Sequence, residues 1–171
     1  MGESLDHLWA GWRTTYIEAV SGDREPLDPD ATGSLFERIL RMDDEAGYVV
    51  HRASLCSVLL NAYPYTNGHL LVLPNQAAAE LDELDADTFA ELFFLVRQSV
   101  TAIRAAYGCD GVNVGLNLGA AAGAGVPDHL HVHCLPRWAG DTNFMTSVAE
   151  TRVMPEPLDR SWEKLRAAWP T

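Results

Sequence analysis

The stretch His129-Leu130-His131-Val132-His133 places three of the chain's six histidines within one short segment. Strict alternation of histidine with apolar residues is typical of a half-buried β-strand, whose side chains point to opposite faces in turn. We therefore predict that the three imidazoles share one face, while Leu130, Val132 and Cys134 point into a core. Because the charge of histidine changes near neutral pH, this face indicates phosphate chemistry or metal binding, unless it is simply a polar outer face.

Four further strands and three helices are predicted along the chain. A capping box of Ser34 and Glu37 begins a short helix over about 35–45, and Gly47 ends it. A long helix is capped by Asp85 and ends at Gly108, because its apolar residues recur every three or four positions. A last helix is expected over Leu158–Trp169, with Asp159 as a possible cap. The predicted strands are Tyr48–His51, Cys56–Asn61, His69–Leu73, Gly111–Asn117 and His129–Leu135. This order of an antiparallel meander interrupted by one long helix indicates the α+β class.

Length and charge limit the classes of function. The 171 residues predict a single domain over 1–171, with an N-terminal extension and loop over 1–33, a core over 34–138 and a C-terminal tail with a helix over 139–171. A formal charge of −12 argues against nucleic-acid partners and anionic membrane surfaces. No apolar run approaches the roughly 20 residues that span a bilayer. Three scattered cysteines and an acidic start without a secretory signal favour a cytoplasmic protein.

A glycine-rich loop precedes the histidines and an arginine follows them. Gly119, Gly123 and Gly125 let the backbone approach a ligand closely, and successive amides there can form an anion-binding nest. Arg137 is predicted either to hold a distal phosphate or to pair with a surface carboxylate, and both interpretations stay open. Loop, histidines and arginine together favour a phosphate site over a metal site made of the three imidazoles.

The segment from Asn117 to Trp138 resembles the histidine-triad (HIT) family of nucleotide-binding proteins, whose signature alternates histidine with apolar residues. Leu59–Pro64 and Gly68–Pro74 resemble the nucleotide-pocket strands of that family, and Leu8–Arg13 is similar to the N-terminal segment of its diadenosine polyphosphate phosphorylase branch. The resemblance implies a HIT-like fold with a five-stranded antiparallel sheet. It also implies a homodimer in which the sheet is continuous.

The resemblance assigns roles to individual residues. It implies that His131 attacks phosphorus, that a backbone carbonyl of the same strand orients its ring, and that His129 and His133 bound the α-phosphate and handle protons. His69 matches a fourth active-site histidine. Asn61 matches a ribose-binding position and Asn117 a phosphate-binding one, although each can instead cap a loop. The loop residues expected to contact phosphate through their backbone are Gly123, Ala124 and Gly125.

One departure from the family concerns zinc. Several relatives hold a structural zinc through a Cys-x-x-Cys pair and two histidines, and the matching positions here are Ser34, Glu37, Ala77 and His129. Three of the four ligand types are absent, and a closed zinc site needs four donors. We therefore predict no cofactor and no structural zinc, with Mg²⁺ only as a counter-ion of the substrate. The first helix should then be held by hydrogen bonds.

The resemblance implies an enzyme acting on an adenine nucleotide or a dinucleoside polyphosphate. The preferred prediction is a diadenosine tetraphosphate phosphorylase or hydrolase that forms a nucleotidyl-histidine. The motif does not say whether phosphate or water is the second acceptor. Two alternatives stay open, an adenosine 5'-phosphoramidate hydrolase and a weakly catalytic nucleotide-binding protein.

Overall fold

The structure is a computed structural model that describes residues 32–141 and 156–170. These residues all belong to one compact unit. The predicted N-terminal segment, including Trp9 and Trp12, lies outside the described residues. None of the described helices is long and apolar enough to cross a membrane.

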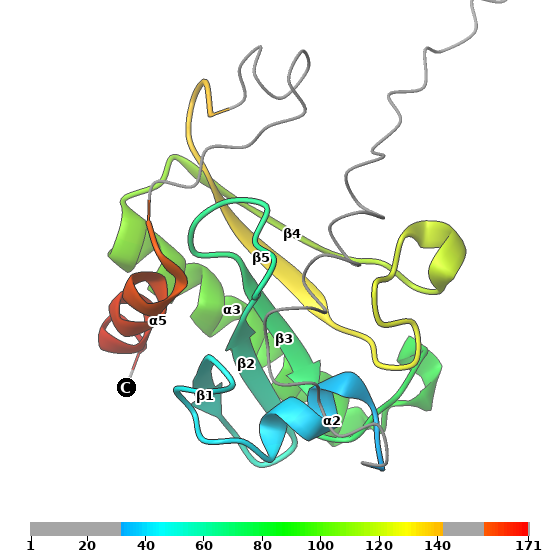
Figure 1. The fold of residues 1–171 in the computed structure, drawn as a ribbon. Helices are drawn as coiled ribbons and strands as arrows, with labels where there is room; N and C mark the ends of the chain where they lie inside the picture. Colours follow the sequence, from blue (N-terminus) through cyan, green and yellow to red (C-terminus); the bar gives the residue numbers. More distant parts are fainter. Residues whose placement is uncertain (1–31, 142–155, 171) are drawn as a thin grey trace, which may run out of the picture. The chain divides into compact units, whose positions relative to one another are not determined.

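A five-stranded antiparallel sheet forms the centre of the fold, which confirms the predicted α+β class (Figure 1). Its strands are β1 (Val49–Arg52), β2 (Cys56–Leu60), β3 (Leu70–Pro74), β4 (Gly111–Leu116) and β5 (Val132–Arg137). They lie in the order β1-β2-β3-β5-β4. The histidine-bearing β5 is therefore an interior strand, between β3 and the edge strand β4.

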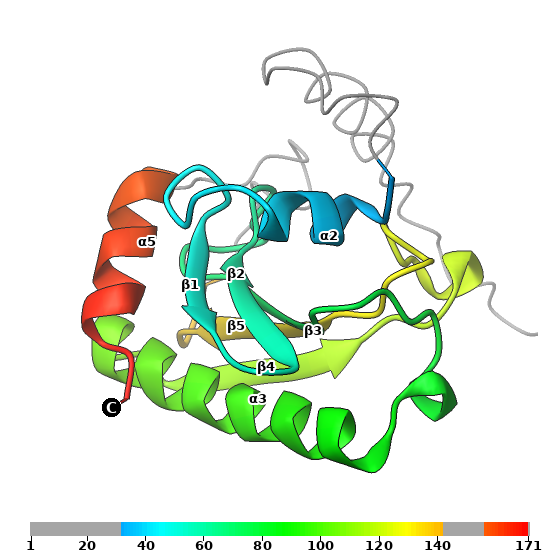
Figure 2. The same ribbon diagram turned by 90° about the horizontal axis from the view of Figure 1, so that it is seen from below.

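Helices lie on both faces of this sheet and at one end of it. The helical elements are α2 (Leu35–Leu40), η1 (Leu81–Glu83), α3 (Ala86–Tyr107), η2 (Ala120–Ala122) and α5 (Leu158–Ala167). Figure 2 shows α3 along one face of the sheet, α2 across the opposite face, and α5 beside β1. The caps of α3 are those predicted, since Asp85 accepts from the Thr88 amide and Gly108 adopts the left-handed conformation.

The core has two parts, one on each face of the sheet. Under α3, alternate strand residues such as Val58, Val72 and Cys134 pack against Leu92 and its neighbours. On the other face, Phe36 of α2 packs against Leu59, Leu71 and Leu73. The three cysteines Cys56, Cys109 and Cys134 are free. Because His133 pairs with Leu71, the site histidine lies on the α2 face.

Two element boundaries differ from those predicted by three residues or more, and one predicted cap is absent. Helix α2 ends at Leu40, well before Gly47, because residues 43–48 form their own turns. Strand β5 begins only at Val132, so two of the three histidines precede the paired strand. The side chain of Asp159 does not cap α5, since it accepts a hydrogen bond from the Tyr48 hydroxyl instead.

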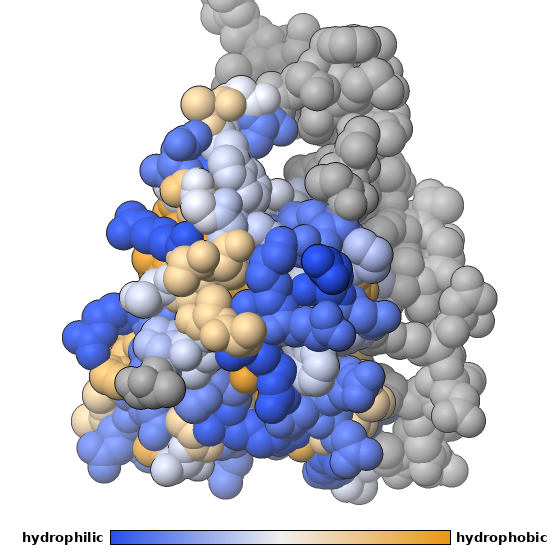
Figure 3. Space-filling view, turned by 90° about the vertical axis from the view of Figure 1, so that its left-hand side faces the viewer, coloured by the Kyte–Doolittle hydropathy of each residue, from blue (hydrophilic) through white to orange (hydrophobic). Residues whose placement is uncertain are grey.

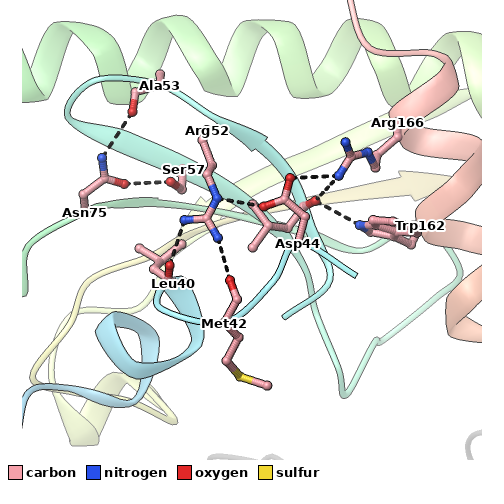
Figure 4. Close-up of polar contacts among 10 residues, drawn as sticks. Leu40, Met42, Asp44, Arg52, Ala53, Ser57, Asn75, Trp162 and Arg166 are labelled. Atoms are coloured by element: carbon pink, nitrogen blue, oxygen red, sulfur yellow. Dashed lines mark hydrogen bonds and ion pairs between the residues drawn. The ribbon is translucent and has the colours of Figure 1, made fainter. Parts of the chain in front are cut away.

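The C-terminal helix α5 is fastened to the outer strand β1. The Trp162 indole donates to the Val49 carbonyl at 2.9 Å, and Leu165 is fully buried in the core under α3. Asp44 joins Arg52 and Arg166 in one charged network, and Arg52 also donates to the last carbonyls of the α2 region (Figure 4). Hydrophilic residues cover most of the face on which α5 lies (Figure 3).

Candidate active site

His131 has one ring nitrogen bonded to the backbone and the other turned away from it. Its Nδ1 lies 2.9 Å from the carbonyl oxygen of His129. The family resemblance implies a carbonyl of the same strand at this position. A carbonyl oxygen can only accept, so Nδ1 carries the proton and Nε2 carries the lone pair. The side chain is 5% exposed, and burial lowers the pKa of His131 below its ordinary value. The ring is therefore neutral at neutral pH and has the tautomer of a nitrogen nucleophile.

His69 and His133 form a hydrogen-bonded pair beside His131. The His69 Nδ1 accepts from the backbone amide of Tyr65 at 3.1 Å, so Nε2 carries the proton of this ring. That Nε2 donates to the His133 Nδ1 at 2.8 Å. His133 consequently carries its own proton on Nε2, and its ring centroid lies 4.9 Å from that of His131. A hydrogen-bond donor is thus placed next to the nucleophile.

The loop between β2 and β3 encloses this pair. The Tyr65 ring stacks on His133 with centroids 5.9 Å apart and tilts over His69 at 4.7 Å. Asn61 donates to the His69 Nδ1 at 3.2 Å, and its side-chain oxygen accepts from the Tyr63 amide. The amide of Asn61 thus already has the loop-capping role that was one of its two predicted uses. Ribose binding by Asn61 stays a prediction.

His129 differs from its expected role next to the phosphate. The ring is fully buried, its Nε2 lies 2.9 Å from the Pro74 carbonyl oxygen, and its Nδ1 lies 2.6 Å from the Ser34 hydroxyl. Both nitrogens are therefore bonded inside the protein. This arrangement leaves the side chain no atom with which to handle protons at a leaving group. His129 instead supplies the carbonyl that orients His131.

The same bonds argue against a metal site made of the three imidazoles. Such a site would need each ring to turn a lone pair toward one point. Both ring nitrogens of His129 are bonded to Pro74 and Ser34, and the Nδ1 of His133 accepts from His69. Among the described residues, no group of three or more His, Cys, Asp or Glu side chains is arranged to hold a metal ion.

The glycine-rich loop is more tightly folded than the predicted nest. Gly119 and Gly123 adopt positive φ values around the short helix η2, as the sequence led us to expect of glycine here. The amides of Gly123 and Ala124, however, donate to the carbonyls of Ala120 and Gly119 at 3.0 and 3.3 Å. Consecutive amides from 123 to 125 are therefore not all directed at a ligand in this structure. The phosphate role of Gly123, Ala124 and Gly125 stays a prediction.

The end of β4 lies beside the histidines. Gly115 pairs with His133 and Leu116 with Val132, so continuing the register by one residue places Asn117 opposite His131. Directly paired residues carry their side chains on the same face, so Asn117 lies where its predicted phosphate contact requires. A Cβ at Gly115 would meet no atom within 4 Å, so the space beside His133 is open on this face.

Arg137 lies far from this cluster. It is the last residue of β5, six residues beyond His131, which at 3.3 Å per residue corresponds to roughly 20 Å. Its guanidinium pairs with Asp141 at 2.6 Å and also donates to Asn113 at 2.9 Å. The structure therefore favours the surface ion pair over the phosphate contact, two uses that the sequence left open.

Three contacts of the site were not predicted from the sequence. Tyr65 covers the His69–His133 pair, and Phe36 packs edge-on against His129 and His131 at 5.4 and 5.0 Å. The third is the Ser34 hydroxyl on His129. Apart from the contact of Tyr65 with His69, these contacts join residues far apart in the chain, and the capping box at Ser34 was the one local signal.

Comparison with known proteins places these features in a family. A family model described as HIT domain matches residues 44–140. An AP-4-A phosphorylase from Mycobacterium tuberculosis is 36% identical over 167 residues, which cover 98% of this chain and 86% of that protein. An asymmetrical bis(5'-nucleosyl)-tetraphosphatase from Schizosaccharomyces pombe is 34% identical over 93 residues, covering 54% of this chain and 50% of that one.

Solved structures agree with the sequence matches. A zinc-bound histidine triad family protein from Mycobacterium smegmatis superposes with a TM-score of 0.60 and 26% identity, over 90% of this chain and 91% of that one. A histidine triad nucleotide-binding protein from Sulfolobus tokodaii gives a TM-score of 0.60 and 31% identity, over 71% of this chain and 82% of that one.

Proposed function

This chain belongs to the HIT domain family, and from that premise we propose that it cleaves a dinucleoside polyphosphate at the α-phosphorus through a nucleotidyl-histidine on His131. The observation that carries this proposal is the bond from His131 Nδ1 to the His129 carbonyl. It leaves a neutral Nε2 as the attacking atom, next to a histidine whose proton lies on Nε2.

The chemistry follows from these two tautomers. The lone pair on His131 Nε2 forms a bond to the α-phosphorus, and the bond from phosphorus to the bridging oxygen breaks. The departing polyphosphate oxygen leaves as an anion that accepts a hydrogen bond from His133 Nε2, because a neutral imidazole that gave up its one proton would become an imidazolate. An acceptor then attacks the phosphorus, the P–N bond breaks, and His131 returns to its neutral form. Any proton that the acceptor loses passes to solvent.

Phosphate is the acceptor we favour for the second step. The support is the extent of similarity, because the match to the AP-4-A phosphorylase covers 98% of this chain, whereas the match to the asymmetrical tetraphosphatase covers 54%. With diadenosine tetraphosphate as the substrate, the first step releases ATP and phosphate then releases ADP. If water were the acceptor, the second product would be AMP.

The open space at Gly115 favours a large leaving group. A dinucleoside tetraphosphate must place a triphosphate and a second nucleoside beyond the α-phosphorus, whereas a phosphoramidate releases only an amine. Gly115 is the pairing partner of His133, whose Nε2 is the proposed hydrogen-bond donor to the leaving oxygen, and no atom lies near the missing side chain of Gly115. This geometry supports the dinucleoside substrate over the phosphoramidate alternative.

The test is incubation of the protein with diadenosine tetraphosphate, with and without inorganic phosphate, followed by identification of the products. We expect ADP and ATP, formed only when phosphate is present. AMP and ATP formed without phosphate would identify a hydrolase instead. Faster turnover of adenosine 5'-phosphoramidate than of diadenosine tetraphosphate, with or without phosphate, would favour the phosphoramidate alternative.

The His131→Ala variant tests the covalent step. We expect turnover to be abolished while nucleotide binding is largely retained, and we expect the wild-type protein to yield a labelled nucleotidyl-histidine when the reaction is quenched in the absence of an acceptor. Substantial activity of the variant would exclude the mechanism. A wild-type protein that binds nucleotide without forming the labelled adduct would be the weakly catalytic binding protein.

A further inference from the structure

One hydrogen-bonded cluster, which we call the α2 clasp, joins Ser34 and Glu37 at the start of α2 to Ala77 and His129. The Ser34 hydroxyl lies 2.6 Å from the Nδ1 of His129. The Glu37 carboxylate accepts from the backbone amide of Ser34 at 2.8 Å and from that of Ala77 at 3.1 Å. Ser34 is 7% exposed and His129 is fully buried. The clasp thus fastens the start of α2 to the segment after β3 and to the triad.

The clasp occupies the four positions at which the family resemblance implies zinc ligands, and its residues do not fit zinc. Both carboxylate oxygens of Glu37 accept backbone N–H groups, and the side chain of Ala77 has no donor atom. The Nδ1 of His129 faces a hydroxyl rather than a thiolate. A closed zinc site needs four deprotonated or neutral donors directed at one point, which these residues do not supply.

The direction of each bond in the clasp follows from its neighbours. His129 donates from Nε2 to the Pro74 carbonyl, so its Nδ1 can only accept. The Ser34 hydroxyl must therefore donate its proton to that Nδ1. The same hydroxyl oxygen accepts from the Glu37 amide at 3.2 Å, as a helix cap does. One hydroxyl thus caps α2 and donates to the ring of His129, whose tautomer the Pro74 carbonyl fixes.

We propose that Ser34 is a positioning residue for the nucleophile and that it acts through His129. The ring of His129 is held by Ser34, and the backbone carbonyl of the same residue holds the His131 Nδ1. Because ring and carbonyl belong to one residue, a backbone shift of His129 that follows loss of the Ser34 bond would displace the carbonyl that sets the tautomer and direction of His131. This inference rests on the proposed function, because it requires His131 to be the attacking group.

Helix α2 supplies a second contact that depends on the clasp. Phe36 lies between the clasp residues Ser34 and Glu37, and its ring packs edge-on against both His129 and His131. Loosening the clasp therefore shifts the wall of the site together with the hydrogen bond. A catalytic group displaced by about 1 Å can lose on the order of 100-fold in rate.

The test compares Ser34→Ala with Ser34→Thr, which keeps the hydroxyl. We expect kcat with diadenosine tetraphosphate and phosphate to fall by roughly 10- to 100-fold in Ser34→Ala with little change in KM, and to recover in Ser34→Thr. We also expect the ¹⁵N shifts of the His131 ring in the substrate-free protein to change from a single Nδ1–H tautomer to a mixture in Ser34→Ala. The Glu37→Gln variant, which keeps the Ser34 hydroxyl, should show a smaller loss of kcat.

Ser57→Ala is the matched control. Ser57 is also a buried serine that donates a side-chain hydrogen bond, here to Asn75 at 2.7 Å, but it lies outside the clasp. Ser57→Ala should lose stability comparable to that lost in Ser34→Ala, while kcat and the His131 ¹⁵N shifts stay unchanged.

Wild-type kcat and ¹⁵N shifts in Ser34→Ala would overturn the proposal, as would an equal loss of kcat in Ser57→Ala. If the wild-type protein turns over no nucleotide, the proposed function fails, whereas the ¹⁵N shifts still decide whether Ser34 fixes His131. Should Ser34→Ala not fold, the same two measurements on Glu37→Gln decide, and unchanged values there would overturn it.

Discussion

At the scale of single residues, the site depends on which nitrogen of each histidine carries the proton. The carbonyls of His129 and Pro74 fix the tautomers of His131 and His129, and the backbone amide of Tyr65 fixes that of His69. None of these partners is charged. The rings are therefore prepared as neutral groups by hydrogen bonds and burial, which suits a nucleophile that must attack a phosphorus surrounded by negative oxygens.

The pH dependence of activity should follow from the burial of His131. Burial disfavours the imidazolium, so the pKa of His131 lies below its ordinary value of 6.5, and the neutral nucleophile persists as the pH falls below 6.5. We expect the acidic limb of kcat/KM to lie below pH 6.5. Phe36→Ala, which opens one wall of the ring, should move that limb upward. An acidic limb at or above 6.5 in the wild-type protein would contradict this assignment.

At the scale of elements, hydrogen bonds between residues near in the chain could be predicted from the sequence, whereas those between distant residues could not. The caps of α3 at Asp85 and Gly108 and the capping box of α2 were predicted, because these bonds join residues a few positions apart. The hydrogen bonds that occupy both ring nitrogens of His129 come from Ser34 and Pro74, which lie 95 and 55 residues away. The alternation pattern likewise predicted the shared face of the histidines but could not show that pairing begins at Val132.

The turn before β3 depends on Gly68. Its φ is +74°, and a Cβ built there would overlap the ring of Tyr107 at the end of α3. We expect Gly68→Ala to lower the free energy of unfolding by about 2–4 kcal/mol, since it combines backbone strain with overpacking. Gly108→Ala is the control, because its φ is +55° with no atom within 4 Å. It should cost only about 1 kcal/mol in urea denaturation. Equal losses in the two variants would show that the contact with Tyr107 is unimportant.

Strand β4 should set the size of the leaving group. Gly115→Val places a branched side chain in the open space beside His133. We expect kcat/KM for diadenosine tetraphosphate to fall by about 10-fold or more, an effect worth about 1.4 kcal/mol, while turnover of adenosine 5'-phosphoramidate changes little. The ratio of the two values is the measurement. A parallel loss for both substrates would mean that the leaving group does not pass over Gly115.

At the scale of the whole molecule, one edge of the sheet is covered by a helix and the other is open among the described residues. The β1 edge is covered by α5, whose Trp162 and Arg166 both donate to the Val49 carbonyl. Within the part of the chain that the structure describes, β4 pairs with β5 alone, so its outer edge has no partner strand. Long exposed edges invite pairing with another chain. Helix α3, which packs on β4, also exposes three large aromatic side chains, Phe89, Phe93 and Phe94, at 41–46%.

We therefore expect two copies of the chain to pair through their β4 strands and to form one continuous sheet, as the family resemblance implies. Val114 lies in the middle of β4 and is 46% exposed, so Val114→Lys would bring two like charges together at the two-fold axis. We predict a wild-type dimer at micromolar concentration and a monomer for Val114→Lys in sedimentation equilibrium. Ala167→Lys on the exposed side of α5 is the control and should stay dimeric, because the face on which α5 lies is mostly hydrophilic (Figure 3). A monomeric wild-type protein, or a dimer that Ala167→Lys disrupts and Val114→Lys does not, would place the interface elsewhere or remove it.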